Sequence, residues 1–168
     1  LLQGVHFSAA AMAYDIGRRA LCVNLSDLAA MGATPRWFTL ALSVPAELAT
    51  DEWLGQLSTG LGDVADRAGC ALVGGDTTRG PLALTLTLIG EVPAGQALRR
   101  DGAQSGDRIY VTGTLGDGAA ALEMLSNEAL ATPDARLFEH FYAPKLRLEE
   151  GIRLRNIASA CIDVSDGL

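Results

Sequence analysis

One segment constrains the fold of this chain more than any other: Leu72-Val73-Gly74-Gly75-Asp76-Thr77-Thr78-Arg79-Gly80. An apolar run that stops at two glycines predicts the end of a β-strand, here over residues 71–75. Glycine lets the backbone approach a ligand closely, because no Cβ stands in the way. The Asp76 carboxylate can hold a hard cation. The threonine hydroxyls and the arginine guanidinium that follow it can bind anionic oxygens. The alternative is a plain turn in which Asp76 accepts hydrogen bonds from the next backbone amides.

The hydrophobic periodicity of the chain predicts alternating helices and strands. Leucine alternates with alanine and threonine over residues 82–89, which is typical of a strand with one buried face. We expect Asp15 to cap the first helix and Thr50 or Asp51 to cap the second, which ends at Gly69. The other patterns predict helices over 15–32, 50–68, 134–141 and 145–157, a helix that opens within 113–118 and runs to 126, and strands over 36–45, 71–75, 107–112 and 158–162.

A carboxylate lies in line with the apolar stripe of the first predicted helix. Ile16, Ala20 and Val23 share one face at helical spacing, and four residues further the same face reaches Asp27. A buried carboxylate needs a cation or hydrogen-bond donors, which favours a ligand role for Asp27. The alternative is that Asp27 lies at the rim of the face and caps a neighbouring backbone amide.

Two further acidic residues follow the strand predicted over 158–162. Asp163 and Asp166 lie three residues apart, with Ser165 between them. Two carboxylates at the end of a strand repel each other unless a cation lies between them. The turn that contains them is therefore a second candidate for binding a cation.

The candidate metal ligands are thus four aspartates at the ends of apolar segments: Asp27, Asp76, Asp163 and Asp166. None has a Cys or His neighbour at metal-ligand spacing, which disfavours zinc. Carboxylate oxygens favour Mg²⁺, and Mg²⁺ held by carboxylates is typically shared with the phosphates of a substrate. The pattern indicates nucleotide chemistry without the Gly-Lys-Ser/Thr loop of P-loop enzymes.

The composition excludes several classes of protein. The 168 residues carry a net charge of −7, and Lys145 is the only lysine, which makes nucleic acid an improbable partner. Cys22, Cys70 and Cys161 are odd in number and form no CxxC motif, so we expect a reducing, cytoplasmic location. No uncharged apolar run reaches the roughly 18 residues of a membrane span.

The best internal boundary is the Pro/Gly-containing stretch 93–96, which predicts an N-terminal domain over 1–94 and a second domain from 95 to 168. Both ends read as the interior of structured segments, so we expect the sequence to be part of a longer protein.

Five motifs together resemble the thiamine-monophosphate kinase family, which is similar to aminoimidazole ribonucleotide synthetase, selenophosphate synthetase and a hydrogenase-maturation protein. They occur in that family's order and span the chain. The segment from Gly74 to Pro81 is the most specific. The motifs are Gly4-Val5-His6-Phe7, Asn24-Leu25-Ser26-Asp27-Leu28-Ala29-Ala30-Met31-Gly32-Ala33, Gly74-Gly75-Asp76-Thr77-Thr78-Arg79-Gly80-Pro81, Gly113-Thr114-Leu115-Gly116-Asp117 and Ile162-Asp163-Val164-Ser165-Asp166-Gly167.

The resemblance implies an α/β fold and ATP-dependent phosphorylation of thiamine monophosphate to thiamine diphosphate. The fold would be an α+β N-terminal domain that forms a shared β-barrel in a homodimer, followed by the start of an α/β domain. The phosphoryl group would pass directly, in line, with Mg²⁺. By resemblance, Asp27, Asp76, Asp163 and Asp166 are metal ligands, Gly75, Asp76, Arg100 and Ser165 contact ATP, and His6 contacts the substrate.

Several alternatives remain open. His6 read without the resemblance is a strand-end histidine whose partner is the backbone. The protein can be another ATP-dependent synthetase of the same superfamily, or an inactive dimerisation or nucleotide-binding module. The family has further N-terminal metal and nucleotide residues that this sequence lacks, so we expect the isolated segment to be inactive.

Overall fold

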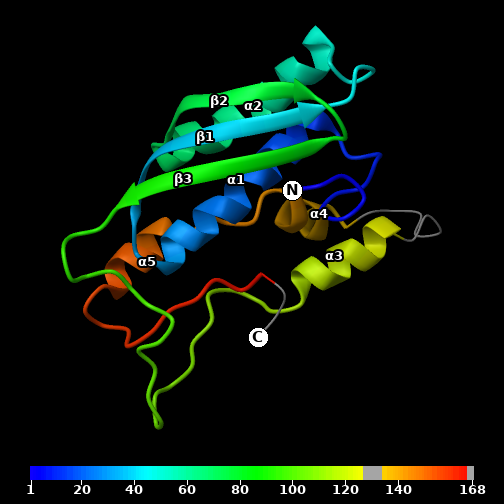
Figure 1. The fold of residues 1–168 in the computed structure, drawn as a ribbon. Coiled ribbons are helices and arrows are strands. Elements are labelled where there is room, and N and C mark those ends of the chain that lie inside the picture. The colour runs from blue at the N-terminus through cyan, green and yellow to red at the C-terminus, as the bar shows by residue number, and fades with distance from the viewer. Residues whose placement is uncertain (127–133, 166–168) are drawn as a thin grey trace.

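The computed structural model describes residues 1–126 and 134–165 of the chain. Within them a mixed sheet is covered on one face by helices, with shorter helices following it (Figure 1). The elements are, in chain order, α1 (Ala13–Ala30), β1 (Thr34–Val44), α2 (Asp51–Ala68), β2 (Ala71–Arg79), β3 (Ala83–Glu91), α3 (Asp117–Ser126), α4 (Ala135–Tyr142) and α5 (Leu148–Leu154).

The sheet has three strands in the order β2-β1-β3. Strand β1 pairs in parallel with β2 and antiparallel with β3. Helices α1 and α2 lie behind the sheet in Figure 1, which leaves its other face towards the viewer. A sheet with helices on one face is an α+β arrangement, as the resemblance implied for the N-terminal part.

The core lies between the sheet and these two helices. Phe38 and Leu42 of β1 and Leu84 of β3 are buried against Leu25 of α1 and Leu61 of α2. This confirms the predicted alternation, because the leucines of β3 point inwards while its threonines stay exposed. The described helices include none that is both long and apolar enough to cross a lipid bilayer.

Glycines allow α1 and α2 to cross with their backbones almost in contact. A Cβ at Gly17 would lie 2.5 Å from the backbone oxygen of Leu57, and a Cβ at Gly60 would collide with the backbone oxygen of Tyr14. The ends of α2 confirm the sequence prediction, since Thr50 accepts a hydrogen bond from the Trp53 amide and the C-cap Gly69 has a φ of 63°.

The N-terminus of α1 differs from the prediction. Its N-cap is Met12, which makes no side-chain capping bond, while Asp15 lies inside the first turn and is buried. Asp15 instead forms an ion pair with Arg18, at 3.3 Å, one turn further along the helix. The prediction of Asp15 as the cap was wrong, because the helix begins at Ala13 and the Asp15 carboxylate forms its ion pair from inside the first turn.

Strand β2 continues further than the sequence indicated. The residues expected to form a loop after Gly75 are strand up to Arg79, and Asp76 pairs with Ala41 of β1. Gly75 lies so close to β1 that a Cβ there would collide with the backbone oxygen of Leu40. The two glycines therefore allow close pairing to β1 instead of ending the strand, because β1 is long enough to pair beyond them.

The strands predicted over 107–112 and 158–162 do not form in the described structure. Ile109 and Tyr110 are about 80% exposed. In the later segment the Ala158 amide bonds to the Leu154 oxygen and the Cys161 amide to the Arg99 oxygen, each at 3.0 Å. An apolar segment becomes a strand only where a neighbour forms a continuous ladder of hydrogen bonds with it, and neither segment has such a ladder among the described residues.

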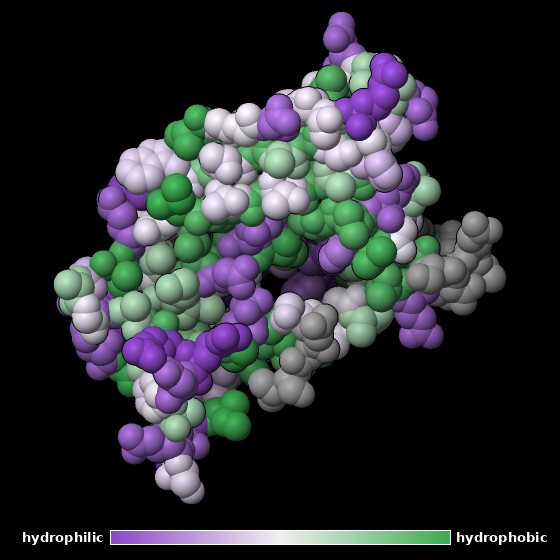
Figure 2. All heavy atoms as spheres, in the orientation of Figure 1, coloured by the Kyte–Doolittle hydropathy of each residue, from purple (hydrophilic) through white to green (hydrophobic). Residues whose placement is uncertain are grey.

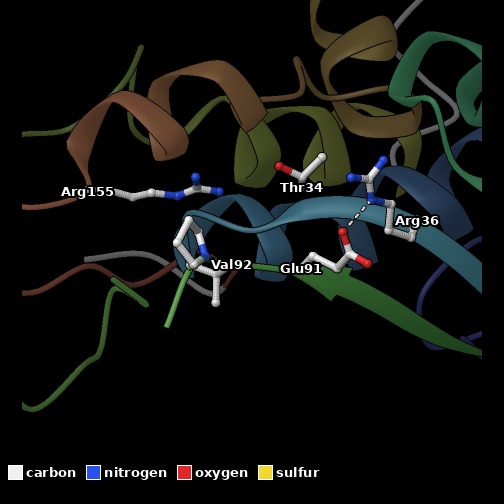
Figure 3. A pocket seen from close by; sticks show the side chains of 6 residues that line it. Thr34, Arg36, Glu91, Val92 and Arg155 are labelled. Atoms are coloured by element: carbon white, nitrogen blue, oxygen red, sulfur yellow. Dashed lines mark hydrogen bonds and ion pairs between the residues drawn. The ribbon is translucent and has the colours of Figure 1, made fainter. Parts of the chain in front are cut away.

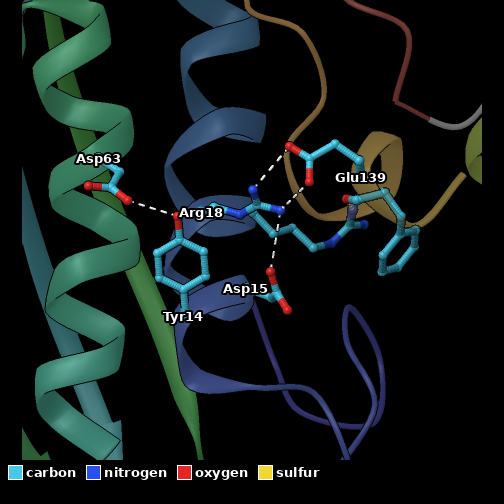
Figure 4. Close-up of polar contacts among 7 residues, drawn as sticks. Tyr14, Asp15, Arg18, Asp63 and Glu139 are labelled. Atoms are coloured by element: carbon cyan, nitrogen blue, oxygen red, sulfur yellow. Dashed lines mark hydrogen bonds and ion pairs between the residues drawn. The ribbon is translucent and has the colours of Figure 1, made fainter. Parts of the chain in front are cut away.

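Polar contacts of α1 hold α4 in place (Figure 4). Arg18 donates two hydrogen bonds to the Glu139 carboxylate, at 3.0 and 2.6 Å, and the guanidinium of Arg19 lies 3.8 Å from the ring centroid of Phe141. Tyr14 donates a hydrogen bond of 2.8 Å to Asp63, which links α1 to α2. Helix α1 thus contacts both its partner under the sheet and the later part of the chain.

We predict that Gly60→Ala lowers the free energy of unfolding by about 1–3 kcal/mol, because the new methyl group forces the crossing helices apart. Gly55→Ala in the same helix is the matched control, since nothing lies within 4 Å of a Cβ at that position. The control should gain about 0.5–1 kcal/mol from the higher helix propensity of alanine. Urea unfolding measures both, and equal effects would contradict the close crossing.

Candidate functional site

Two of the predicted metal ligands lie side by side. Asp27 is near the C-terminal end of α1, and Asp163 lies on the segment that follows α5. Asp27 is exposed, so it lies at the rim of the apolar face as the alternative expected, and the premise of a buried carboxylate was wrong. Its pKa is raised, first because its surroundings partly desolvate the charged form, and then because the Asp163 carboxylate repels it and shares a hydrogen bond with it. Two carboxylates that repel each other in this way would be stabilised in their charged forms by a cation bound between them.

Helix α5 brings this pair together. A Cβ at Gly151 would collide with the backbone oxygen of Ala29, so α5 lies directly against the C-terminal end of α1. Just after α5, the Nε of Arg155 donates a hydrogen bond of 2.6 Å to the backbone oxygen of Gly32. The chain then leads to Asp163, close to Asp27. Sequence reasoning missed Arg155, because an arginine near a helix end usually indicates only a solvated side chain.

The third predicted ligand lies elsewhere. Ala41 is exposed on the outer face of the sheet, because its neighbours Leu40 and Leu42 point inwards to the core. Asp76 pairs with Ala41 and therefore lies on the same outer face. That face is the one opposite α1 and α2, so Asp76 does not join Asp27 and Asp163 within one copy of the chain. Among residues 1–126 and 134–165, no group of three or more His, Cys, Asp or Glu side chains could hold a metal ion. Asp166 lies outside the described residues.

The predicted ATP contacts come from three separate segments. Gly75 and Asp76 are in β2, Arg100 is exposed in the loop that follows β3, and Ser165 is exposed at the end of the described chain. Gly75 has a φ of 150°, which other residues rarely adopt, and its close approach to β1 already requires glycine. The glycine is therefore explained by strand pairing, whether or not a nucleotide binds beside it.

His6 has a backbone partner, as the reading without the resemblance expected. Its Nδ1 accepts a hydrogen bond of 3.0 Å from the Leu2 amide, and its backbone oxygen accepts one from Arg19, also at 3.0 Å. An accepting Nδ1 leaves Nε2 as the donor of the neutral ring. Because the residue is exposed, that donor remains available to a substrate.

The Asp27–Asp163 pair fits a hard divalent cation in its chemistry. Both side chains offer oxygen atoms, one of them is partly desolvated, and the described structure supplies no arginine or lysine that forms an ion pair with either. The pair alone provides two of the ligands that such a cation needs, so further oxygens have to come from water, substrate or other residues.

Comparison with known proteins gives consistent results. Residues 1–92 match the family described as AIR synthase related protein, N-terminal domain. Thiamine-monophosphate kinase of Salmonella typhimurium is 47% identical over 171 residues, which covers 100% of this chain and 52% of that protein. The enzyme of Escherichia coli K12 is 48% identical over 172 residues, with the same coverage of both chains. The chain thus spans about half the length of the curated relatives it matches.

Solved structures agree with these sequence matches. The crystal structure of thiamine-monophosphate kinase from Stenotrophomonas maltophilia has a TM-score of 0.92 and 51% identity, and covers 100% of this chain and 55% of its own. A second structure, AaThiL complexed with AMPPCP and TMP, has a TM-score of 0.89 and 31% identity, and the match covers 98% of this chain and 53% of that one.

We predict that Asp27→Asn stabilises the chain in EDTA, because the amide removes the repulsion between residues 27 and 163. The expected gain is only about 0.5 kcal/mol, since solvent screens a partly exposed pair. Asp66→Asn, on the exposed side of α2, is the control and should change stability little. Thermal unfolding measures both variants. A loss of stability in Asp27→Asn would show that the carboxylate makes net attractive contacts instead.

Proposed function

The chain belongs to the AIR synthase related protein family, and on that premise we propose that it is part of a thiamine-monophosphate kinase. Such an enzyme transfers the γ-phosphoryl group of ATP to thiamine monophosphate and forms thiamine diphosphate. The observation that supports this most strongly is the similarity to kinases of this name along the entire chain, at 47% and 48% identity. The similarity to a structure named as a complex with AMPPCP and TMP supports the same substrates.

Mg²⁺ is the cation we propose for Asp27 and Asp163, with Asp76 and Asp166 as further ligands. When bound, Mg²⁺ would neutralise phosphate charge and orient the two phosphorylated molecules. The chain itself carries a net charge of −7 and would repel both substrates. The carboxylates of Asp27 and Asp163 therefore act by attracting the cations that make the approach of two anions possible.

The chain's other polar groups have separate parts in this proposal. The guanidinium of Arg100 and the hydroxyl of Ser165 bind phosphate oxygens of ATP, and the backbone at Gly75 lies against the nucleotide. His6 donates from its exposed ring to the thiamine monophosphate. Direct transfer fits a chain in which we identify no covalent nucleophile, since phosphoryl transfer depends mainly on positioning and charge neutralisation.

A homodimer would bring the separated residues together. The sheet face opposite the helices is uncovered in the described structure, with Trp37 and its cross-strand neighbour Ile89 exposed by 43% and 46%. Figure 2 shows mostly pale and apolar residues over these strands. We propose that this face packs on the same face of a second copy to form a shared barrel, with Asp76 at the interface. Residues 1–94 would form the dimerising domain and residues 95–168 the start of the next one.

A kinase assay tests the proposed reaction. A polypeptide that contains this chain and spans the full length of the curated relatives is incubated with Mg²⁺, ATP and thiamine monophosphate, and thiamine diphosphate is measured. Aminoimidazole precursors and selenide are tested in parallel as substrates of the related synthetases. We expect thiamine diphosphate to form and the other two reactions to be absent. Product from a related substrate alone, or nucleotide binding without turnover, would contradict the proposal.

The same polypeptide tests Asp76. We predict that Asp76→Asn abolishes Mg²⁺-dependent ATP binding in calorimetry and leaves the melting temperature almost unchanged, because the side chain is exposed and makes no described hydrogen bond. Asp66→Asn again serves as the control and should bind ATP normally. A large loss of stability with ATP binding intact would support a structural role for Asp76.

A further inference from the structure

A cavity of about 420 Å³ lies where the start of β1, the end of β3 and the residue after α5 meet. None of the carboxylates proposed to bind Mg²⁺ lines it, so it is separate from the candidate site. Figure 3 shows the guanidinium groups of Arg155 and Arg36 on either side of Thr34, with Glu91 and Val92 facing them. The lining consists of Thr34, Arg36, Glu91, Val92, Pro93 and Arg155.

The side chain of Arg155 is fixed by a hydrogen bond, and no described carboxylate pairs with its positive charge. Its Nε donates to the backbone oxygen of Gly32, and its Cγ would be 3.2 Å from a Cβ at that glycine. Its Nη2 is buried and has no hydrogen-bond partner in the described part of the chain. No carboxylate within residues 1–126 and 134–165 forms an ion pair with Arg155. A buried donor without an acceptor is uncommon in folded proteins, and the positive charge of Arg155 has no ion-pair partner among the described residues that line the cavity.

Arg36 contributes a second guanidinium to the same cavity. Its Nε donates a hydrogen bond of 2.8 Å to Glu91, so these two charges balance each other. The remaining nitrogens of Arg36 have no hydrogen bond to any described residue, because the pair uses one donor of a group that has five. With Arg155 added, the lining has a net charge of +1 in a protein whose total charge is −7.

We propose that this cavity binds a small molecule through an oxyanion, a phosphate or a carboxylate, held by Arg155 and Arg36. A guanidinium presents paired N–H groups that match the oxygens of either anion. Thr34 adds a hydroxyl, and Val92 and Pro93 form an apolar surface for the body of the molecule. The positive lining repels metal cations, and two arginines are too few to bind a nucleic acid to an acidic protein.

The test titrates inorganic phosphate and acetate, in separate arms, into the ¹⁵N-labelled chain at constant ionic strength. EDTA is present throughout, so the Mg²⁺-dependent site makes no contribution and the result does not depend on the proposed kinase activity. The amide signals of Thr34, Glu91 and Val92 report on the cavity. We expect at least one anion to shift these signals saturably, and the anion with the higher affinity identifies the preferred group.

Variants that change the charge of the cavity lining are expected to change the anion affinity in opposite directions. Arg36→Gln and Arg155→Gln should each weaken binding about tenfold, the loss expected for one charge-assisted hydrogen bond. Glu91→Gln should tighten binding several-fold, because it removes the negative charge in the cavity. Arg153→Gln is the matched control on α5, since that side chain is 79% exposed and pairs with Glu149 outside the cavity.

The proposal is overturned by an absence of saturable shifts with both anions, by unchanged affinity in Arg36→Gln, or by weaker binding in Glu91→Gln. Arg155 also anchors Gly32, so Arg155→Gln can unfold the chain. In that case Arg36→Gln and Glu91→Gln, which change exposed side chains, decide the outcome.

Discussion

The close contact of helix backbones along α1 is the constraint on which the rest of the structure depends. Gly17 and Gly60 let α1 cross α2 at one end, and Gly151 lets α5 lie on the other end. At each of these positions a methyl group would meet a backbone oxygen, which cannot move aside as a flexible side chain can. Glycine therefore sets the distance between three helices, and the sheet and the aspartate pair are positioned relative to them.

Arginine side chains add hydrogen bonds and ion pairs to the helix contacts that the glycines allow. Arg18 is only 13% exposed at its side chain and binds the more exposed Glu139 with two hydrogen bonds, so the ion pair is fixed in direction at its arginine end. The pKa of Asp15 is raised, mainly because burial disfavours its charged form, and Arg18 offsets part of this effect. At the far end of α1, Arg155, the residue after α5, donates a hydrogen bond to the backbone oxygen of Gly32. A chain with a single lysine relies on guanidinium groups, which bind in fixed directions, to dock its later helices.

The sequence allowed prediction of the parts of the fold that depend on local pattern. Helices α1 and α2, the strands β1 and β3, and the cap at Thr50 all follow from hydrophobic period and side-chain chemistry. The extension of β2 through Asp76 did not, because it depends on the length of its neighbour β1. The segments 107–112 and 158–162 carry the composition of strands but lack a described neighbour to pair with. The sequence pattern and the resemblance named Asp27 and Asp163 as candidates, whereas their contact with each other required α5 to fold back onto α1.

The central claim is that packing of α5 on α1 creates the electrostatic environment of Asp27. The most direct test follows the Asp27 carboxyl carbon by NMR through a pH titration, without divalent cations, in the original chain and in Gly151→Ala. The account predicts a pKa of Asp27 above its ordinary value in the original chain, because partial desolvation and Asp163 both disfavour its charge. In Gly151→Ala the pKa should fall towards the ordinary value as α5 and the segment after it move away. The same raised pKa in both chains, or an ordinary pKa in the original, would contradict the claim.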